Sequence, residues 1–127
     1  MNPDVQSILS QVTLDEPFDE AADLVAVLSE KGKPWGFFAG RTSYGGVALL
    51  EHLVILPEAR KKGRILALAE AWAAVCRAKG LRWAVFGMPV TRKRPDLIRY
   101  ARFWGFMPYG SDEKNVWWKK DLNLKKE

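Results

Sequence analysis

Cysteine and histidine are almost absent from this 127-residue chain, which contains one of each. A single cysteine, Cys76, permits no internal disulfide, so we expect a reducing location such as the cytoplasm. One histidine, His52, together with one cysteine cannot form a zinc site of the usual four-ligand kind. We therefore expect a fold that is held together without disulfides and a site that uses no metal.

Long apolar runs and the common nucleotide motifs are also missing. No run approaches the roughly 20 residues that a membrane-spanning helix needs, and no signal peptide opens the chain. The sequence has no P-loop lysine motif, no G-x-G-x-x-G and no G-x-S-x-G. These absences argue against a membrane partner, a P-loop NTPase, a dinucleotide-binding fold and an α/β-hydrolase.

The composition is that of one globular domain, with 48% hydrophobic and 28% charged residues. We expect a single domain over 1–127, with a short helix and a connection in 1–20 and a flexible basic tail in 122–127. The net charge of +5 permits an anionic partner, such as a phosphate-bearing cofactor, a nucleic acid or an acidic protein. Charge alone does not choose among these partners.

The most informative stretch runs from Leu53 to Gly80. It predicts a buried strand that ends before Pro57, a basic turn at 60–64, and an amphipathic helix over 64–79 that stops at Gly80. The first turn of a helix has unpaired N–H groups and the positive end of the macrodipole. With Gly63 allowing close approach, the turn is either an anion site or a solvated connection.

The remaining pattern alternates between strands and helices around this stretch. Pro95 and Asp96 open one helix and Gly105 ends it, and the strand over 81–90 reads as buried on both faces. The strands over 47–56 and 81–88 should pair in parallel through a right-handed crossover. The further expected elements are a helix over 4–12, strands over 22–29 and 34–41, a helix over 95–104, and a closing hairpin of strands over 106–109 and 116–121. This order predicts an α+β fold with a mixed, mostly antiparallel twisted sheet and flanking helices.

The turn resembles the acyl-CoA signature of the GNAT N-acetyltransferase superfamily, V-x-P-x-x-[QR]-x-x-G-x-[GA]. Ile55, Pro57, Arg60 and Gly63 match it, and Ile65 departs at the last position. The element order is similar to that family from its second strand onward, so the fold would be abbreviated at its N-terminus. The resemblance implies acetyl-CoA as the acyl donor, with backbone N–H groups of the turn around its pyrophosphate. The cofactor-binding residues that it implies are Leu53, Ile55, Arg60, Lys61, Lys62, Gly63, Arg64 and Ile65.

Acyl transfer to an amine requires a base and an acid. Glu51 and His52 are the titratable side chains within the strand over 47–56, and adjacent strand residues face opposite sides. Glu51 is the first candidate for the base, because burial would raise its pKa; the alternative is an ion-paired residue on an exposed face. His52 is the second candidate, against a role as a half-buried polar residue.

The second functional segment of the family reads N-x-x-[AS]-x-x-x-Y-x-x-x-G-F. Gly105 and Phe106 match its end, whereas Arg94 stands at the asparagine and Ala101 at the tyrosine. Tyr100, one residue before the tyrosine position, is the candidate acid. One residue on a helix is a rotation of about 100°, so the alternative is that Tyr100 points away from the thiolate and serves in amphipathic packing.

Three hypotheses follow for the function. The first is a GNAT-like enzyme that transfers an acetyl group from acetyl-CoA to a primary amine, on an acceptor that a protein could supply. The second is a catalytically silent GNAT-fold protein that acts as a structural or partner-binding component. It is suggested because the stretch over 97–106 resembles small GNAT-like proteins of tailed bacteriophages, which would place the chain in a virion and in a homo-oligomer or larger assembly. The third, which we favour least, is a nucleic-acid binder that uses the basic clusters at 60–64 and 92–94. Tryptophans such as Trp72, Trp83 and Trp104 are expected in the core rather than as base-stacking residues.

Overall fold

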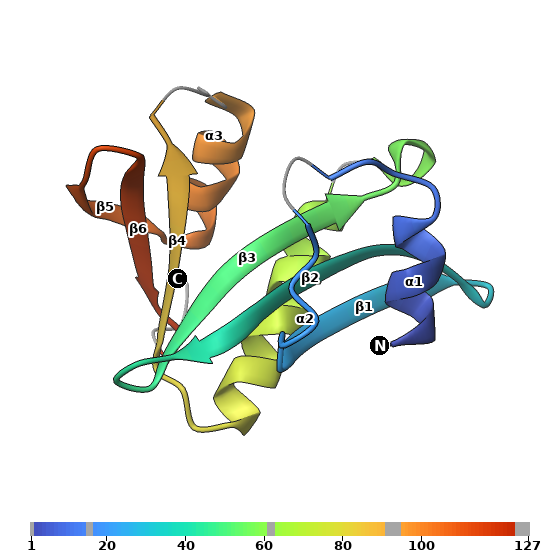
Figure 1. Cartoon of the computed structure of the whole chain (residues 1–127), viewed down its shortest axis with the longest axis horizontal. Helices are drawn as coiled ribbons and strands as arrows, with labels where there is room; N and C mark the ends of the chain where they lie inside the picture. Colours follow the sequence, from blue (N-terminus) through green and yellow to red (C-terminus); the bar gives the residue numbers. More distant parts are fainter. Residues whose placement is uncertain (1, 15–16, 61–62, 91–94, 124–127) are drawn as a thin grey trace.

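The computed structural model describes residues 2–14, 17–60, 63–90 and 95–123. It consists of one six-stranded mixed sheet with helices on both faces (Figure 1). In chain order the elements are α1 (Pro3–Leu9), β1 (Leu24–Glu30), β2 (Lys33–Ser43), β3 (Val47–Ile55), a 3₁₀ turn (Pro57–Ala59), α2 (Arg64–Ala78), β4 (Trp83–Pro89), α3 (Pro95–Trp104), β5 (Met107–Ser111) and β6 (Asn115–Asp121). The predicted α+β class and element order are confirmed.

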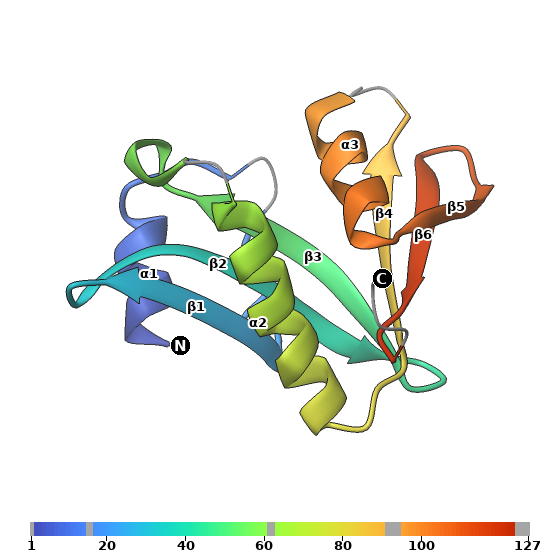
Figure 2. The same cartoon turned by 180° about the vertical axis from the view of Figure 1, so that it is seen from behind.

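The strands lie in the order β1-β2-β3-β4-β6-β5, so the sheet has two antiparallel halves. The halves meet at β3 and β4, which form the parallel pair that the sequence predicts. The helix α1 packs on one face, against β2, whereas α2 packs on the opposite face, against β1 and β2. Figure 2 shows α2 and α3 on this second face, α2 across the first half of the sheet and α3 across β4 and β6.

The helix termini lie at capping residues that the sequence offers, except for the C-terminus of α1. Gly80 and Gly105 have φ of +77° and +105°, the left-handed conformation that glycine adopts at a helix C-terminus. Asn2 caps α1 by accepting from the N–H groups of Asp4 and Val5. The predicted helix over 4–12 is too long, because α1 ends at Leu9 and the Ser10 hydroxyl donates to the Ser7 carbonyl oxygen.

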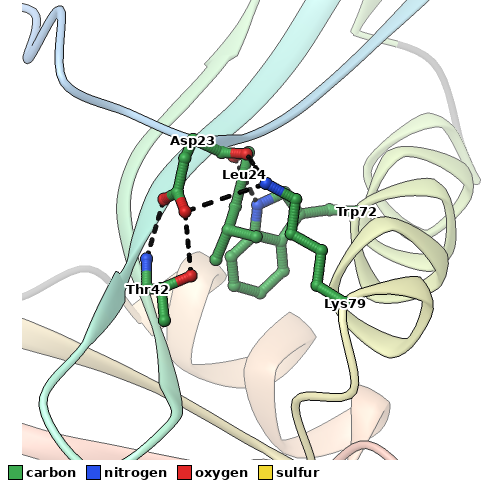
Figure 3. Close-up of polar contacts among 5 residues, drawn as sticks. All are labelled: Asp23, Leu24, Thr42, Trp72 and Lys79. Carbon is green, nitrogen blue, oxygen red and sulfur yellow. Dashed lines mark hydrogen bonds and ion pairs between the residues drawn. The ribbon is translucent and has the colours of Figure 1, made fainter.

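Polar contacts join α2 and the residue that follows it, Lys79, to the start of β1 and to β2, as Figure 3 shows. The buried Trp72 indole donates to the Leu24 carbonyl oxygen at 3.0 Å. The Lys79 ammonium donates to the Asp23 carbonyl oxygen at 2.9 Å and lies 3.8 Å from the Asp23 carboxylate. That carboxylate accepts from the backbone N–H and the hydroxyl of Thr42, at 2.8 and 2.9 Å. These bonds hold α2 in a fixed position over the sheet.

The six strand predictions hold to within two residues at each end, but the burial predicted for one strand and the start predicted for the tail are wrong. The strand predicted over 81–90 is β4, and it is not buried on both faces: Trp83, which we expected in the core, is 37% exposed. The cause is that α3 covers only one face of this half of the sheet (Figure 2). The expected tail over 122–127 begins too early, because Leu122 is buried and its N–H donates to the Arg82 carbonyl oxygen.

No helix among the described residues is both long and apolar enough to cross a membrane. Cys76 is buried in the core, as its place on the apolar stripe of α2 predicts. Burial raises the pKa of its thiol to about 12, so the sulfur stays protonated and acts as a packing group.

Candidate functional site

The parallel strands β3 and β4 diverge soon after they meet. Their ladder contains three residue pairs, from Val47 opposite Trp83 to Leu49 opposite Val85. Beyond Leu49, the edge of β3 that faces β4 is no longer paired with that strand. Backbone N–H and C=O groups along this edge are therefore available to a ligand.

A β-bulge lies in β3 at the point of divergence. Ala39 of β2 pairs with His52 and Gly40 pairs with Leu50, so Glu51 is the extra residue. A Cβ atom on Gly40 would lie 2.1 Å from the Leu49 carbonyl oxygen, so only glycine fits opposite the bulge. The bulge turns the end of β3 away from β4 and places two consecutive side chains, Leu50 and Glu51, on the same cavity.

A cavity of about 180 Å³ lies between the diverging strands β3 and β4 and the helices α2 and α3. Its walls are mostly apolar, with Glu51 and Tyr100 as the polar side chains. The residues that line it are Phe38, Leu50, Glu51, Leu53, Ile65, Leu66, Ala69, Phe86, Gly87, Leu97, Tyr100, Ala101, Trp104 and Phe106. The Trp104 indole donates to the Glu70 carboxylate at 2.8 Å, which joins α3 to α2 across the cavity.

Glu51 lies at the cavity with its carboxylate 3.6 Å from the Arg41 guanidinium. Its side chain is partly buried. The sequence left open whether Glu51 is a cavity residue or an ion-paired surface residue, and in the structure it lines the cavity and is also ion-paired. The ionised carboxylate is the form of this side chain that can accept a proton.

His52 does not line this cavity. Its ring packs against Phe18, with centroids 5.2 Å apart, and Phe18 in turn packs edge-on against Phe37. The Asp19 N–H lies 3.4 Å from His52 Nε2, which would accept a long hydrogen bond. His52 thus contacts the segment that precedes β1, and the alternation of β3 places Glu51 and His52 on different faces as predicted.

Tyr100 and Ala101 are adjacent on α3 and both line the cavity. Ala101 is buried, whereas the Tyr100 side chain is partly exposed. Tyr100 therefore reaches the cavity despite its displacement by one residue from the family pattern. Arg94 lies outside the described residues.

The basic turn before α2 is only partly described, because Lys61 and Lys62 lie outside the described residues. Gly63 is the N-cap of α2 with φ of +85°, no side chain of the described residues caps this helix, and a Cβ on Gly63 would meet no described atom within 4 Å. Ile65, at the position where the family signature ends in a small residue, lines the cavity with its side chain.

The two described arginines of the turn make contacts within the protein. The Arg60 Nε donates to the Ile55 carbonyl oxygen at 3.1 Å. Arg64 forms an ion pair of 2.6 Å with Glu30 and lies over the Trp35 ring, 4.6 Å from its centroid. Arg64 lines a second cavity, of about 370 Å³, between this turn and the β1–β2 hairpin. The groups available to an anion at the start of α2 are thus backbone N–H groups rather than these two side chains.

Sequence reasoning identified four of the residues that line the first cavity, namely Leu53, Ile65, Glu51 and Tyr100. It missed Gly40, whose glycine within an apolar strand is a recognisable signal of a bulge. It also missed Phe86, which packs between Phe106 at 4.9 Å and Trp118 at 6.1 Å and forms the β4 wall. Nothing in the local pattern separates Phe86 from an ordinary core residue.

No protein-family model and no curated protein matches the sequence. The structure, in contrast, is similar to many solved structures. One is a protein assigned to the GNAT acetyltransferase family from Desulfovibrio desulfuricans, with a TM-score of 0.69, 15% identity, and coverage of 77% of this chain and 67% of that one.

Two further solved structures are similar to the same extent. PaiA N-acetyltransferase from Thermoplasma acidophilum, in complex with coenzyme A, has a TM-score of 0.68 and 17% identity over 77% of this chain and 60% of that one. The ribosomal-protein-S18-alanine N-acetyltransferase from Escherichia coli has a TM-score of 0.68 and 16% identity over 87% of this chain and 75% of that one. The match therefore spans about two thirds of the length of these proteins, and the chain has the fold of the GNAT N-acetyltransferases.

Proposed function

We propose that this chain is an acyl-CoA-dependent N-acyltransferase that transfers an acetyl group from acetyl-CoA to a primary amine. The observation that carries the proposal is the divergence of β3 from β4 at the Glu51 bulge, which leaves a strand edge and an apolar cavity between them. One of the similar structures, PaiA N-acetyltransferase, is a complex with coenzyme A, which supports the same class of donor here.

The described residues fit the donor in two respects. An acyl-pantetheine arm is long and narrow and carries amide groups, so the apolar cavity and the unpaired edge of β3 offer it both packing and hydrogen bonds. A pyrophosphate would sit at the start of α2, where Gly63 leaves space and the first N–H groups of the helix point outward. Arg60 and Arg64 would support this turn through their contacts with Ile55 and Glu30 rather than bind the phosphates directly.

In the proposed reaction the amine nitrogen attacks the thioester carbonyl carbon. A C–N bond forms, the C–S bond breaks, and the sulfur leaves as a thiolate that takes up a proton. Glu51 would accept the proton from the amine, directly or through a water molecule. Tyr100 would donate a proton to the thiolate. His52 would have no part in these steps, because it does not line the cavity.

The test is an assay of thiol release from acetyl-CoA in the presence of a panel of primary amines and of lysine-containing and N-terminal peptides. We expect amine-dependent release, and a Glu51→Gln variant should lower kcat by roughly 100-fold or more, the usual contribution of a general base. Arg41→Gln is the matched control, since it removes the partner of Glu51 and leaves the carboxylate; it should affect kcat far less. A Tyr100→Phe variant tests the acid in the same way.

If the wild-type protein binds acetyl-CoA but no acceptor in the panel stimulates release, the donor site stands and the acceptor is outside the panel. If it binds no acetyl-CoA while folded, the alternative of a catalytically silent GNAT-fold structural or partner-binding protein is favoured. The departures at Arg94 and Ala101 are the sequence features that motivate this alternative.

A further inference from the structure

One face of the second half of the sheet is not covered by any described helix or loop. It is the face of β4, β6 and β5 opposite α3, as Figure 1 shows. Side chains alternate along β4, so Trp83 points to this face whereas Phe86 points to the cavity side. Trp83, Tyr109 and Met107 are 37, 51 and 66% exposed. We call the surface formed by Arg82, Trp83, Met107, Tyr109 and Lys119 the aromatic face.

Lys119 lies between the two aromatic rings of this face. Its ammonium nitrogen is 5.4 Å from the centroid of Trp83, on β4, and 5.6 Å from the centroid of Tyr109, on β5. Among the described residues, no carboxylate lies within ion-pair distance of Lys119. The order across the three strands is therefore ring, cation, ring.

Arg82 extends this arrangement on the side of Trp83. Its guanidinium lies 5.3 Å from the Trp83 centroid and is held by Asp121, which accepts from Nη2 at 2.8 Å. This bond lowers the pKa of Asp121 and keeps the carboxylate ionised, so Arg82 is largely neutralised and acts mainly as a fixed planar support for the ring. Lys119 is then the cation that is available to a ligand.

We propose that the aromatic face binds single-stranded nucleic acid. Two bases would stack on Trp83 and Tyr109, and the Lys119 ammonium would move from over these rings to the phosphate between the bases. The ring, cation, ring order of the face matches the base, phosphate, base order of a dinucleotide step. Stacking of this kind tolerates any sequence, because every base has a π-face, so the site selects single strands rather than a particular sequence.

Two other occupants fit the same face less well. A second copy of the chain would bring one Lys119 surface against another and would repel at the overall charge of +5. An acidic polypeptide would satisfy Lys119 but has no planar groups that recur on either side of each charge. The acidic residues Asp112 and Glu113 lie at the tip of the β5–β6 hairpin, so the site is confined to the part of the face around Lys119.

The proposal is independent of acyl transfer. The aromatic face and the cavity lie on opposite sides of β4, and no residue lines both. It also differs from a general attraction to the basic clusters at 60–64 and 92–94, because it depends on two rings as well as on charge.

The experiment is a fluorescence-anisotropy titration of labelled ten-nucleotide dT and rU strands with the whole protein at low salt. We expect binding that the double variant Trp83→Ala/Tyr109→Ala weakens by roughly tenfold or more, as expected for the loss of base stacking. Tyr44→Ala is the control for removal of an exposed tyrosine elsewhere, in the β2–β3 turn, and should bind as the wild type does.

A second pair of variants separates the site from net charge. Lys119→Gln and Lys33→Gln change the charge equally, but only Lys119→Gln should weaken binding several-fold and reduce the salt dependence by about one phosphate contact. Equal loss in both lysine variants, unchanged affinity in the double variant, or no binding at low salt would overturn the proposal. So would stronger binding of poly-glutamate than of the oligonucleotides, which would point to an acidic protein partner. Unchanged affinity for acetyl-CoA in all of these variants would show that the donor site is separate.

Discussion

At the residue scale, individual polar contacts decide how well the fold resists a change of pH. The Asp23 carboxylate has a pKa below its ordinary value, chiefly because the Thr42 backbone N–H bonds its ionised form. A carboxyl whose pKa is lowered by folding stabilises the protein above its ordinary pKa. That stabilisation is lost as the pH falls through the lower pKa of the folded state.

Replacement of Asp23 by alanine should therefore lower the free energy of unfolding by about 1 kcal/mol at neutral pH, a modest value because the side chain is half exposed. The difference from the wild type should shrink as the pH falls from 5 towards 2. Urea unfolding across this range measures both effects. Glu20→Ala, which removes another exposed carboxylate nearby, should show neither, and an Asp23 effect that is constant with pH would contradict the assignment.

The residue scale is also where sequence reasoning was least complete. It placed Glu51 and His52 on different faces, because alternation along a strand is a local property. It did not anticipate that Arg41 would lie beside Glu51, because that contact depends on the register between two strands. The indole of Trp118 is a further local detail without an explanation, since its buried N–H has no hydrogen-bond partner among the described groups.

At the element scale, the bulge in β3 sets the shape of the site. It requires Gly40 on β2, where the approach of the Leu49 carbonyl oxygen leaves no space for a side chain. The bulge directs Leu50 and Glu51 to one cavity and ends the pairing of β3 with β4. The long third strand that the sequence predicts thus pairs with β2 on both sides of the bulge, but only its first three residues, 47–49, also pair with β4.

Substitution of Gly40 by alanine should destabilise the protein by roughly 3 kcal/mol, the upper end of the usual cost of overpacking, because backbone atoms would have to move. Gly45→Ala is the control: it lies in the β2–β3 turn with φ of +80°, and a Cβ there would meet no described atom within 4 Å, so its cost should be only about 1 kcal/mol. Thermal and urea unfolding of both variants make the comparison. Equal stability of the two would show that the close approach at the bulge is relieved at little cost.

Elements with strong local signals were predicted well. The helix α3 runs over the predicted residues, since Pro95 and Gly105 mark both of its ends. The end of α1 and the burial of β4 were predicted wrongly, because they depend on a side-chain bond and on which face a later helix covers. The GNAT fold came from a short motif together with the element order, and periodicity alone would have given only a mixed sheet.

At the scale of the whole molecule, two halves of a sheet are joined by a short parallel ladder. Leu122 and Arg77 also connect them, because the Arg77 guanidinium donates to the Leu122 carbonyl oxygen at 2.9 Å. The cavity lies between the halves and is closed by contacts of α2 with α3, including the Glu70–Trp104 bond. A ligand in the cavity would therefore contact both halves at once.

Binding of acetyl-CoA should slow amide hydrogen exchange along the diverging parts of the two strands, over 50–55 of β3 and 86–89 of β4, and at the start of α2. The reason is that the donor would fill the space between the halves and use the unpaired edge of β3. Exchange in β1, on the far edge of the sheet, is the internal control and should change little. Protection that appears only in β5 and β6 would place the donor elsewhere.

The most direct test of the proposed donor site is a calorimetric titration of acetyl-CoA into the wild-type protein and into two glycine variants. Gly63→Val and Gly45→Val introduce the same side chain at left-handed positions with φ of +85° and +80°, both with free space around them, so their backbone strain is alike. We predict a Kd of about 1–100 µM, in the range common for enzyme substrates. This affinity should be kept in Gly45→Val and weakened at least tenfold in Gly63→Val, where the pyrophosphate would approach the turn. Equal affinity in both variants would contradict the placement of the donor, and a folded wild-type protein that takes up no acetyl-CoA would contradict the proposed function itself.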